Sequence, residues 1–153
     1  HPDISFSYNQ DGPFPTLISD RRQLGQAITN ILKNAVESIE EKRKKIPLDG
    51  VVSVDLLMED KALIIRIADN GFGFPSDRQR IMEPYITNRA TGSGLGLAIV
   101  KKIIEEHFGE ISLSDNEPVG AVVTLKFHPE NVASKVGKAK SSLPPSNSDE
   151  VMG

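Results

Sequence analysis

Two segments of the chain repeat apolar residues at helical spacing, and six shorter segments either alternate or are rich in β-branched and aliphatic residues. The first helical segment follows Asp20, a suitable N-cap, and runs to about Lys45, and the second covers residues 95–108. The shorter segments have the length and composition of strands. We expect strands at residues 4–8, 16–19, 51–57, 62–68, 110–114 and 121–127.

The order of these elements predicts an α+β fold. Pairs of neighbouring strands are separated by helices, which favours a two-layer α/β sandwich with a mixed, mostly antiparallel sheet covered by helices on one face. A doubly wound dinucleotide fold would require strict alternation of strands and helices, and this element order does not provide it.

Two segments lie outside this pattern. Residues 70–93 contain many glycines and at most one helical turn, near residues 76–82. A loop of that length in a compact domain is usually functional, often as a lid. From about residue 132 the chain is rich in Ser, Lys, Pro and Gly and cannot bury enough apolar surface to order itself. We therefore expect one domain over residues 1–131 and a flexible, disordered tail over residues 132–153.

Composition and charge narrow the classes of function. The 153 residues carry a net charge of −3 without a block that suggests nucleic-acid binding. The basic run at residues 42–45 is expected to be a solvated last helical turn, favoured by the helix dipole. The chain has no cysteine, which excludes disulfides and thiol chemistry, and no apolar run approaches the length of a membrane span. It begins at His1 without a methionine, which suggests a fragment of a longer protein.

The long helix carries two asparagines in its interior. Asn30 and Asn34 are four residues apart and share one face, and Glu37 extends this polar stripe. Asparagine is a poor helix former, so the pair needs a reason. The two residues are either solvated surface side chains or neutral oxygen ligands that face a cleft. Amide oxygens suit Mg²⁺, which also takes phosphate oxygens.

Glycines mark two further places where a ligand could approach the backbone. Asp69 ends a predicted strand and is followed by Gly71 and Gly73, a pattern that suits either a simple turn or a carboxylate beside a flat amino-bearing ligand. Before the second helix, glycines alternate at Gly92, Gly94 and Gly96. Backbone N–H groups at that positive helix end can meet an anion, and Arg89 can add a cation. The pattern is not a Walker A motif, and by itself it indicates a lid hinge as readily as a phosphate cradle.

The order of these motifs resembles the GHKL (Bergerat-fold) ATP-binding fold, and more closely the catalytic and ATP-binding domain of two-component sensor histidine kinases. The resemblance covers roughly residues 4–128. The long helix and the HFGEI junction are most similar to nitrogen-regulation sensor kinases of the NtrB/NtrY kind. The matching segments are NILKNAVESI (30–39, N box), DNGFGF (69–74, first glycine box), IMEPYITNR (81–89, F box), GSGLGLAIV (92–100, second glycine box) and GAVVTLKF (120–127, closing strand).

The resemblance implies a role for each motif. Asp69 would bind the adenine amino group, Asn34 with Asn30 would bind Mg²⁺, and Asn34 and Arg89 would be catalytic, with Arg89 near the γ-phosphate. Residues 72–93 would form the mobile ATP lid. Phosphoryl transfer is mostly positioning and charge stabilisation, which this set can supply. The implied ATP-binding residues are Asn30, Asn34, Asp69, Gly71, Gly73, Tyr85, Arg89, Thr91, Gly92, Ser93, Gly94, Leu95, Gly96 and Thr124.

Some positions depart from the family pattern. Glu37 stands where many members carry Lys or Arg, and Ser38 where some place an aromatic residue beside the adenine. The junction HFGEI (107–111) replaces the usual Gly-Gly pair. None of the three histidines, His1, His107 and His128, has the family's phospho-acceptor pattern, so the acceptor histidine is expected outside this chain.

The resemblance implies the kinase half of a two-component sensor with ATP and Mg²⁺ as cofactors. Its expected partners are the kinase's own dimerisation and histidine-phosphotransfer domain and, through it, a response regulator. Contact with nucleic acid or membrane is not expected. We expect a monomeric, cytoplasmic domain whose parent can be anchored in the bacterial inner membrane.

Three alternatives remain at this point: an ATPase of the gyrase, Hsp90 or mismatch-repair type, an anti-sigma-type serine kinase, and a module that binds nucleotide without catalysis. Asn30 stands where such ATPases place a water-activating glutamate, so hydrolysis should be slow.

Overall fold

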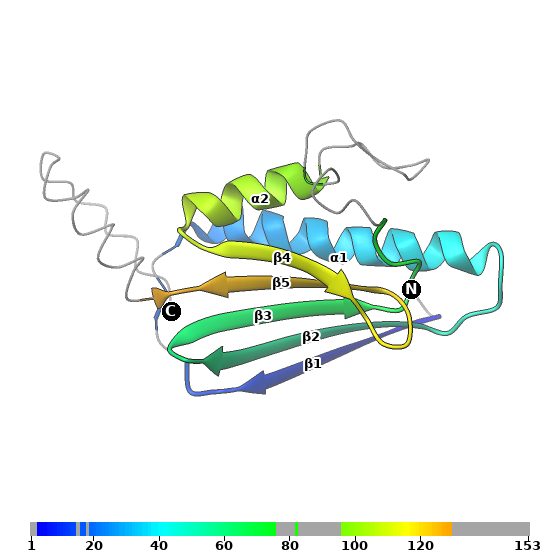
Figure 1. Cartoon of the computed structure of the whole chain (residues 1–153), viewed down its shortest axis with the longest axis horizontal. Coiled ribbons are helices and arrows are strands. Elements are labelled where there is room, and N and C mark those ends of the chain that lie inside the picture. Colours follow the sequence, from blue (N-terminus) through cyan, green and yellow to red (C-terminus); the bar gives the residue numbers. More distant parts are fainter. Residues whose placement is uncertain (1–2, 15, 18, 76–81, 83–95, 130–153) are drawn as a thin grey trace, which may run out of the picture.

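The structure is a computed structural model that describes residues 3–14, 16–17, 19–75, 82 and 96–129. These residues form two layers, with five strands below two helices (Figure 1). The predicted α+β class and the two-layer sandwich are confirmed. The elements are β1 (Ile4–Asp11), α1 (Arg21–Arg43), β2 (Gly50–Glu59), β3 (Ala62–Asp69), α2 (Gly96–Glu106), β4 (Glu110–Asp115) and β5 (Ala121–Phe127).

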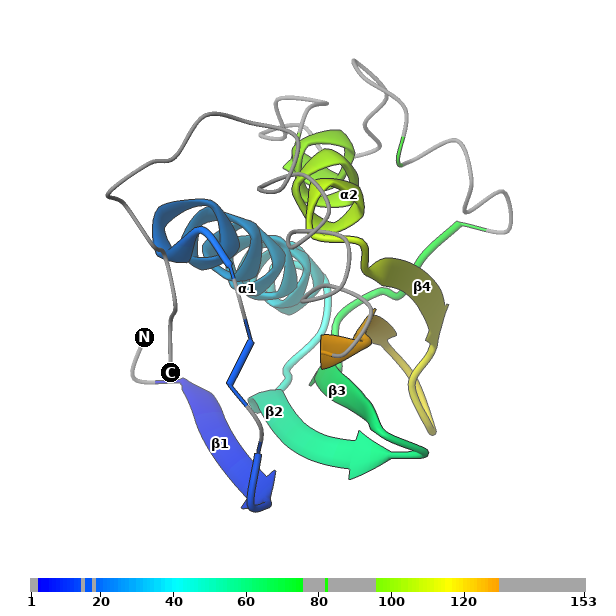
Figure 2. The same cartoon turned by 90° about the vertical axis from the view of Figure 1, so that its left-hand side faces the viewer.

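The sheet is mixed and mostly antiparallel, as the sequence predicts. Its strand order is β1-β2-β3-β5-β4. β1 runs parallel to β2, with Ile4 opposite Gly50, and the other three neighbouring pairs are antiparallel. Figure 2 shows α1 and α2 side by side on the same face of this sheet. The C-terminal end of β3 therefore lies beside the helix layer, where Asp69 pairs with Ala121 of β5.

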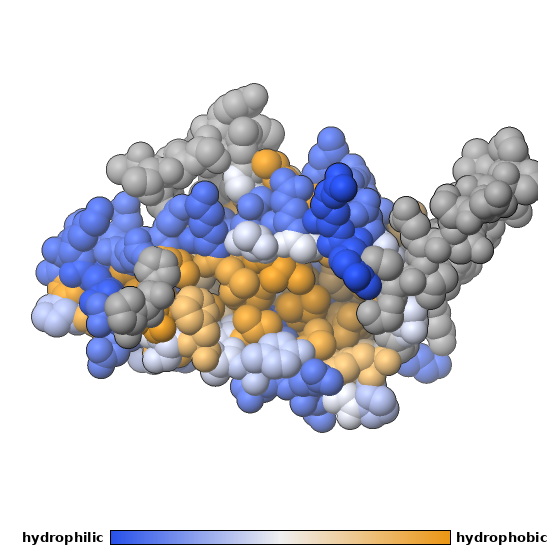
Figure 3. Space-filling model, turned by 180° about the vertical axis from the view of Figure 1, so that it is seen from behind, coloured by the Kyte–Doolittle hydropathy of each residue, from blue (hydrophilic) through white to orange (hydrophobic). Residues whose placement is uncertain are grey.

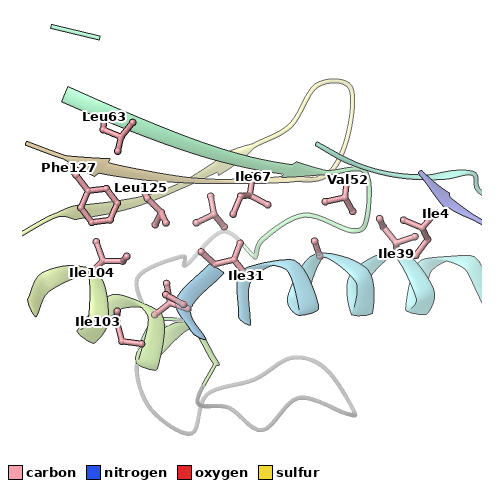
Figure 4. Close-up of a cluster of buried hydrophobic side chains, with 14 residues drawn as sticks. Ile4, Ile31, Ile39, Val52, Leu63, Ile67, Ile103, Ile104, Leu125 and Phe127 are labelled. Atoms are coloured by element: carbon pink, nitrogen blue, oxygen red, sulfur yellow. The ribbon is translucent and has the colours of Figure 1, made fainter. Parts of the chain in front are cut away.

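The core fills the space between the two layers. Apolar residues at helical spacing point from α1 and α2 toward the sheet, and alternate residues of the strands point toward the helices (Figure 4). From the side opposite to Figure 1, hydrophobic residues form a band between two polar margins (Figure 3). The most deeply buried large side chains are Phe127, Ile39, Ile67, Ile104, Leu125, Val52 and Val100.

The ends of α1 follow from local chemistry. Asp20 has extended backbone angles, and its Oδ1 accepts a hydrogen bond from the backbone N–H of Gln23 at 3.1 Å, so the predicted N-cap is confirmed. The helix ends at Arg43, two residues before the predicted end. Lys42 is 8% exposed, so the expectation of a fully solvated basic turn is wrong for this residue.

The strand expected over residues 16–19 is not seen. Only Leu17 makes an isolated bridge there, and residue 18 lies outside the described residues. Prolines at positions 13 and 15 cannot donate hydrogen bonds to a strand ladder, which explains why no strand forms close behind them. The first strand, β1, is longer than the predicted residues 4–8. It extends to Asp11 because every residue from Ile4 to Asp11 pairs with β2.

The C-terminal end of α2 is joined to the beginning of α1 by a buried histidine. The backbone N–H of Asp20 donates to Nε2 of His107 at 2.9 Å, so the ring proton lies on Nδ1, which donates to the carbonyl of Ile103 at 2.8 Å. Phe108 follows with a φ of 59°, a conformation that favours glycine. This backbone conformation fits the Gly-Gly pair that is usual at this junction in the family that the sequence resembles. The two hydrogen bonds of His107 give that residue a structural role.

Candidate functional site

One part of the candidate site is a row of polar residues on α1, called here the polar stripe. It consists of Asn30, Asn34, Ser38 and Lys42, which recur every four residues, one helical turn apart. Asn34 is half-buried and lies against the first residue of α2: a methyl group added to Gly96 would be 3.5 Å from both Oδ1 and Nδ2 of its amide. The N box and the end of the second glycine box therefore meet in the folded chain.

The other part of the candidate site is Asp69, the last residue of β3. Its side chain is 6% exposed, and Oδ1 accepts the backbone N–H of Gly71 at 2.8 Å. Its main-chain carbonyl accepts a hydrogen bond from Nδ2 of Asn116 at 2.8 Å, which ties the end of β3 to the β4–β5 turn. A carboxylate held in this way is a fixed acceptor, suited to an amino group on a ligand.

The turn after Asp69 is packed against α1. A methyl group on Gly71 would be 2.8 Å from Cβ of Ser38 and would also overlap its hydroxyl, so only glycine fits without displacement. Oγ of Ser38 accepts the backbone N–H of Phe72 at 2.9 Å. Nζ of Lys42 donates to the carbonyls of Gly71 at 3.0 Å and Asn70 at 3.3 Å. The stripe on α1 thus contacts the first glycine box directly.

The same turn is fixed from two further sides. The side chain of Asn70 accepts the N–H of Val51 at 2.8 Å and donates to the carbonyl of Asp49 at 2.9 Å, which secures the start of β2. Gly73 has a φ of 85°, and a methyl group there would be 2.9 Å from the carbonyl oxygen of Gly120. These contacts restrain the turn after Asp69 from β2 and from the β4–β5 turn.

Comparison with known proteins decides the family. Residues 19–131 match the family described as histidine kinase-, DNA gyrase B- and HSP90-like ATPase. The chain belongs to this family. The match spans all the motifs of this ATPase family that the sequence predicts.

Two relatives of the chain are NtrY and an NtrY-like protein. The chain is 44% identical over 132 residues to the nitrogen regulation protein NtrY of Azorhizobium caulinodans, which covers 85% of the chain and 17% of that protein. It is 37% identical over 118 residues to a putative NtrY-like sensor histidine kinase of Rickettsia bellii, covering 76% of the chain and 18% of that protein. The chain therefore spans less than a fifth of the length of these relatives.

Solved structures of the family have the same fold. The catalytic domain of the histidine kinase ThkA matches with a TM-score of 0.70 at 25% identity, covering 83% of this chain and 80% of that one. The mycobacterial sensor histidine kinase MprB matches with a TM-score of 0.67 at 30% identity, covering 82% of each chain. The predicted resemblance to a sensor-kinase catalytic domain is confirmed.

The structure places the family's predicted site residues unevenly. On α1, Asn34 lies next to Gly96, and Ser38, one helical turn later, lies next to Gly71. The N–H of Gly71 in turn bonds to the carboxylate of Asp69. Gly73 follows in the same turn, and Asn30 lies half-buried one helical turn before Asn34. Seven predicted residues lie outside the described residues, so their positions stay predictions: Tyr85, Arg89, Thr91, Gly92, Ser93, Gly94 and Leu95.

The structure does not bring Thr124 to this site. Thr124 pairs with Arg66, three residues before Asp69 on β3, and strand alternation directs its side chain to the face away from the helices. The β5 residue opposite Asp69 is Ala121. The adenine contact predicted for Thr124 is therefore not supported by its position, because a strand exposes odd and even residues on opposite faces.

The family's metal would have to rely on amide and phosphate oxygens. Among the residues that the structure describes, no three His, Cys, Asp or Glu side chains gather in a metal site. Asn34 would offer an amide oxygen next to Gly96, the first residue of α2. This donor set fits Mg²⁺, which keeps several waters and binds the phosphates of its nucleotide.

Sequence reasoning missed Ser38, Lys42, Asn70 and Asn116 as supports of the site. A signal for the first two was present, because the four-residue interval that begins at Asn30 continues through Ser38 and Lys42 rather than through Glu37. The two asparagines had no comparable signal, because their partners are far away in the sequence.

Proposed function

We propose that this domain binds Mg-ATP and donates the γ-phosphoryl group to a histidine on a separate dimerisation and phosphotransfer domain of a sensor kinase. The observation that carries the proposal is the contact between Asn34 and Gly96, since it joins the N box to the glycine box within one site. Asp69, at the other end of the stripe, supplies the acceptor for the adenine amino group. A solved relative, ShkA, was crystallised with AMPPNP, matches with a TM-score of 0.68 at 27% identity and covers 82% of this chain.

Each residue has one task in this proposal. Asp69 accepts a hydrogen bond from the base, Asn34 with Asn30 holds the metal ion, and the N-terminal end of α2 faces the phosphates. When bound there, Mg²⁺ would supply positive charge against the phosphate oxygens. A histidine nitrogen of the partner domain then forms the new P–N bond as the bond between the γ-phosphorus and the oxygen of ADP breaks, and the histidine proton passes to solvent. A response regulator takes the phosphoryl group from that histidine.

Hydrolysis is disfavoured by the residue one turn before Asn34. Asn30 has an amide there, and an amide does not accept a proton from attacking water as a carboxylate does. Phosphoryl transfer to a histidine needs no such base, because an imidazole nitrogen is itself a nucleophile. The proposal therefore predicts slow ATPase activity and transfer to the partner domain.

Calorimetric titration with ATP, with and without Mg²⁺, tests the metal assignment. Asn34→Ala removes the amide oxygen and is expected to abolish the gain in affinity that Mg²⁺ gives. Asn9→Ala is the matched control, because Asn9 lies on β1 and bonds to Asp55 at 3.1 Å, away from α1. A Mg²⁺-dependent gain in Asn34→Ala equal to that of the unmodified chain would refute the assignment.

A further inference from the structure

Lys42 is a buried cation that no part of the proposed mechanism uses. It belongs to the basic run 42–45, whose other members lie at the surface or partly exposed. Arg43 pairs with Asp3 at 2.9 Å, and Nζ of Lys45 lies 5.5 Å from the ring centre of Phe72. Lys42 is 8% exposed, and its ammonium group points back toward the first glycine box.

The ammonium group is held by main-chain oxygens. Taking an ammonium group out of water is costly unless it is hydrogen-bonded, so a buried lysine requires firm partners. Here the carbonyls of Gly71 and Asn70 accept from Nζ at 3.0 and 3.3 Å. Bonds that involve an ionised donor are stronger than neutral ones, so this pair restrains both peptide groups.

Ser38 completes the restraint from one helical turn away. Its Oγ accepts the N–H of Phe72 at 2.9 Å, so α1 engages three consecutive residues of the turn that follows Asp69. The backbone N–H of the middle residue, Gly71, donates to Oδ1 of Asp69 at 2.8 Å. The turn that orients the Asp69 carboxylate is thus fixed by the helix that carries Asn34.

We propose that Lys42 is a positioning residue for adenine recognition. It acts through the carbonyls of Asn70 and Gly71 to hold the turn in which Gly71 N–H orients the Asp69 carboxylate, and it does not touch the nucleotide. This inference rests on the proposed binding of ATP. It goes further by separating the base end of the site, which depends on Lys42, from the metal end, which depends on Asn34.

The binding test compares two lysines of the same run. Lys42→Met keeps the aliphatic stem and removes the ammonium, and Lys44→Met makes the same change at an exposed position. We expect Lys42→Met to weaken binding of both ATP and adenosine by about tenfold, while the ratio of ATP affinities with and without Mg²⁺ stays unchanged. Lys44→Met should bind as the unmodified chain does. Lys42→Arg, which keeps a cation and N–H donors, should recover part of the lost affinity.

A second measurement judges the turn without any nucleotide. Amide hydrogen exchange at Gly71 and Phe72 should be faster in Lys42→Met, while the amides of Ile67 and Val123 in the neighbouring strands keep their protection. If Lys42→Met does not fold, Lys42→Gln gives the same comparison, because it removes the ammonium group from the carbonyls of Asn70 and Gly71 and keeps a polar side chain.

The outcomes separate this inference from the proposed function. Unchanged exchange at Gly71 and Phe72 in a folded Lys42→Met variant would overturn the inference, whatever the nucleotide data show. A lower melting temperature with unchanged adenosine affinity would also overturn it, since that is the result of a purely structural lysine. Failure of the unmodified chain to bind ATP, with faster exchange in Lys42→Met, would refute the proposed function and leave the restraint on the turn established.

Discussion

The packing of Gly71 against Ser38 makes a quantitative prediction about stability. A methyl group at Gly71 would lie 2.8 Å from Cβ of Ser38 and 3.0 Å from Oδ1 of Asp69, whereas unstrained carbon–carbon contacts are about 3.5–4.0 Å. Both neighbours are buried, Ser38 at 4% and Asp69 at 6% exposure, so neither can swing into solvent. The turn must therefore move away from α1 in Gly71→Ala, and such overpacking typically costs about 1–3 kcal/mol.

A double-mutant cycle isolates the contact. Ser38→Ala loses the hydrogen bond to Phe72 N–H and should cost about 1 kcal/mol. Gly71→Ala loses the same hydrogen bond when the turn moves, so the double variant loses this bond only once. In the double variant the new methyl group also no longer clashes with the hydroxyl of Ser38, because that hydroxyl is absent. We expect the double variant to be more stable than the sum of the two single effects by about 1 kcal/mol or more.

Urea unfolding followed by circular dichroism measures the cycle. Gly25→Ala is the matched glycine control, because Gly25 is an exposed residue of α1 and the added methyl group would meet no atom within 4 Å apart from its chain neighbours and the backbone of its own helix. It should stabilise the chain by about 0.5–1 kcal/mol and combine additively with Ser38→Ala. If Gly71→Ala and Ser38→Ala add within about 0.3–0.5 kcal/mol, the contact is not energetically coupled and the reasoning fails.

Three further predictions concern the rest of the fold. Phe127→Ala should lower the free energy of unfolding in urea by about 3–5 kcal/mol because Phe127 is fully buried. Phe6→Ala should lower it by about 1 kcal/mol because Phe6 is 55% exposed, and equal losses would contradict the core assignment. Asp20→Ala should cost about 1 kcal/mol and Asp20→Asn almost nothing, because the asparagine oxygen still accepts from Gln23; an Asn variant as unstable as Ala would exclude the cap. Gly120→Ala should lower the melting temperature strongly, because φ is 117° and the methyl group would be 2.8 Å from Cα of Asn70, while Gly96→Ala makes ordinary 3.5 Å contacts; similar melting temperatures would contradict this difference.

Much of the fold was predictable because local signals agree with the tertiary structure. The Asp20 cap, the apolar repeats of both helices and the alternation of the strands each reflect contacts within a few residues. The strand expected at residues 16–19 failed because an apolar pattern says nothing about available partners, and nearby prolines reduce the donors. β1 exceeded its predicted length because its pairing with β2, forty-six residues away, continues through polar residues up to Asp11.

The motif residues of the candidate site were predictable, and the residues that support them were much less so. Asn34, Asp69 and Gly96 carry motif patterns, and the structure brings Asn34 to Gly96. Lys42 was misjudged because a basic run at a helix end usually lies in solvent, and only the three-dimensional path of the first glycine box reveals carbonyls within its reach. Thr124 was misplaced because motif resemblance does not state which face of a strand a residue occupies, whereas the register with β3 does.

The proposed function requires transfer of a phosphoryl group to a histidine outside this chain. The most direct measurement mixes the chain, Mg²⁺ and ATP labelled at the γ-phosphate with the separately prepared phosphotransfer domain of its kinase, with Asn34→Ala as control. We expect a labelled phosphotransfer domain whose label is lost in acid and kept in alkali, as is typical of phosphohistidine, and no label with Asn34→Ala. Release of inorganic phosphate without labelling, or an acid-stable label on a hydroxyl side chain, would contradict it in favour of an ATPase or a serine kinase.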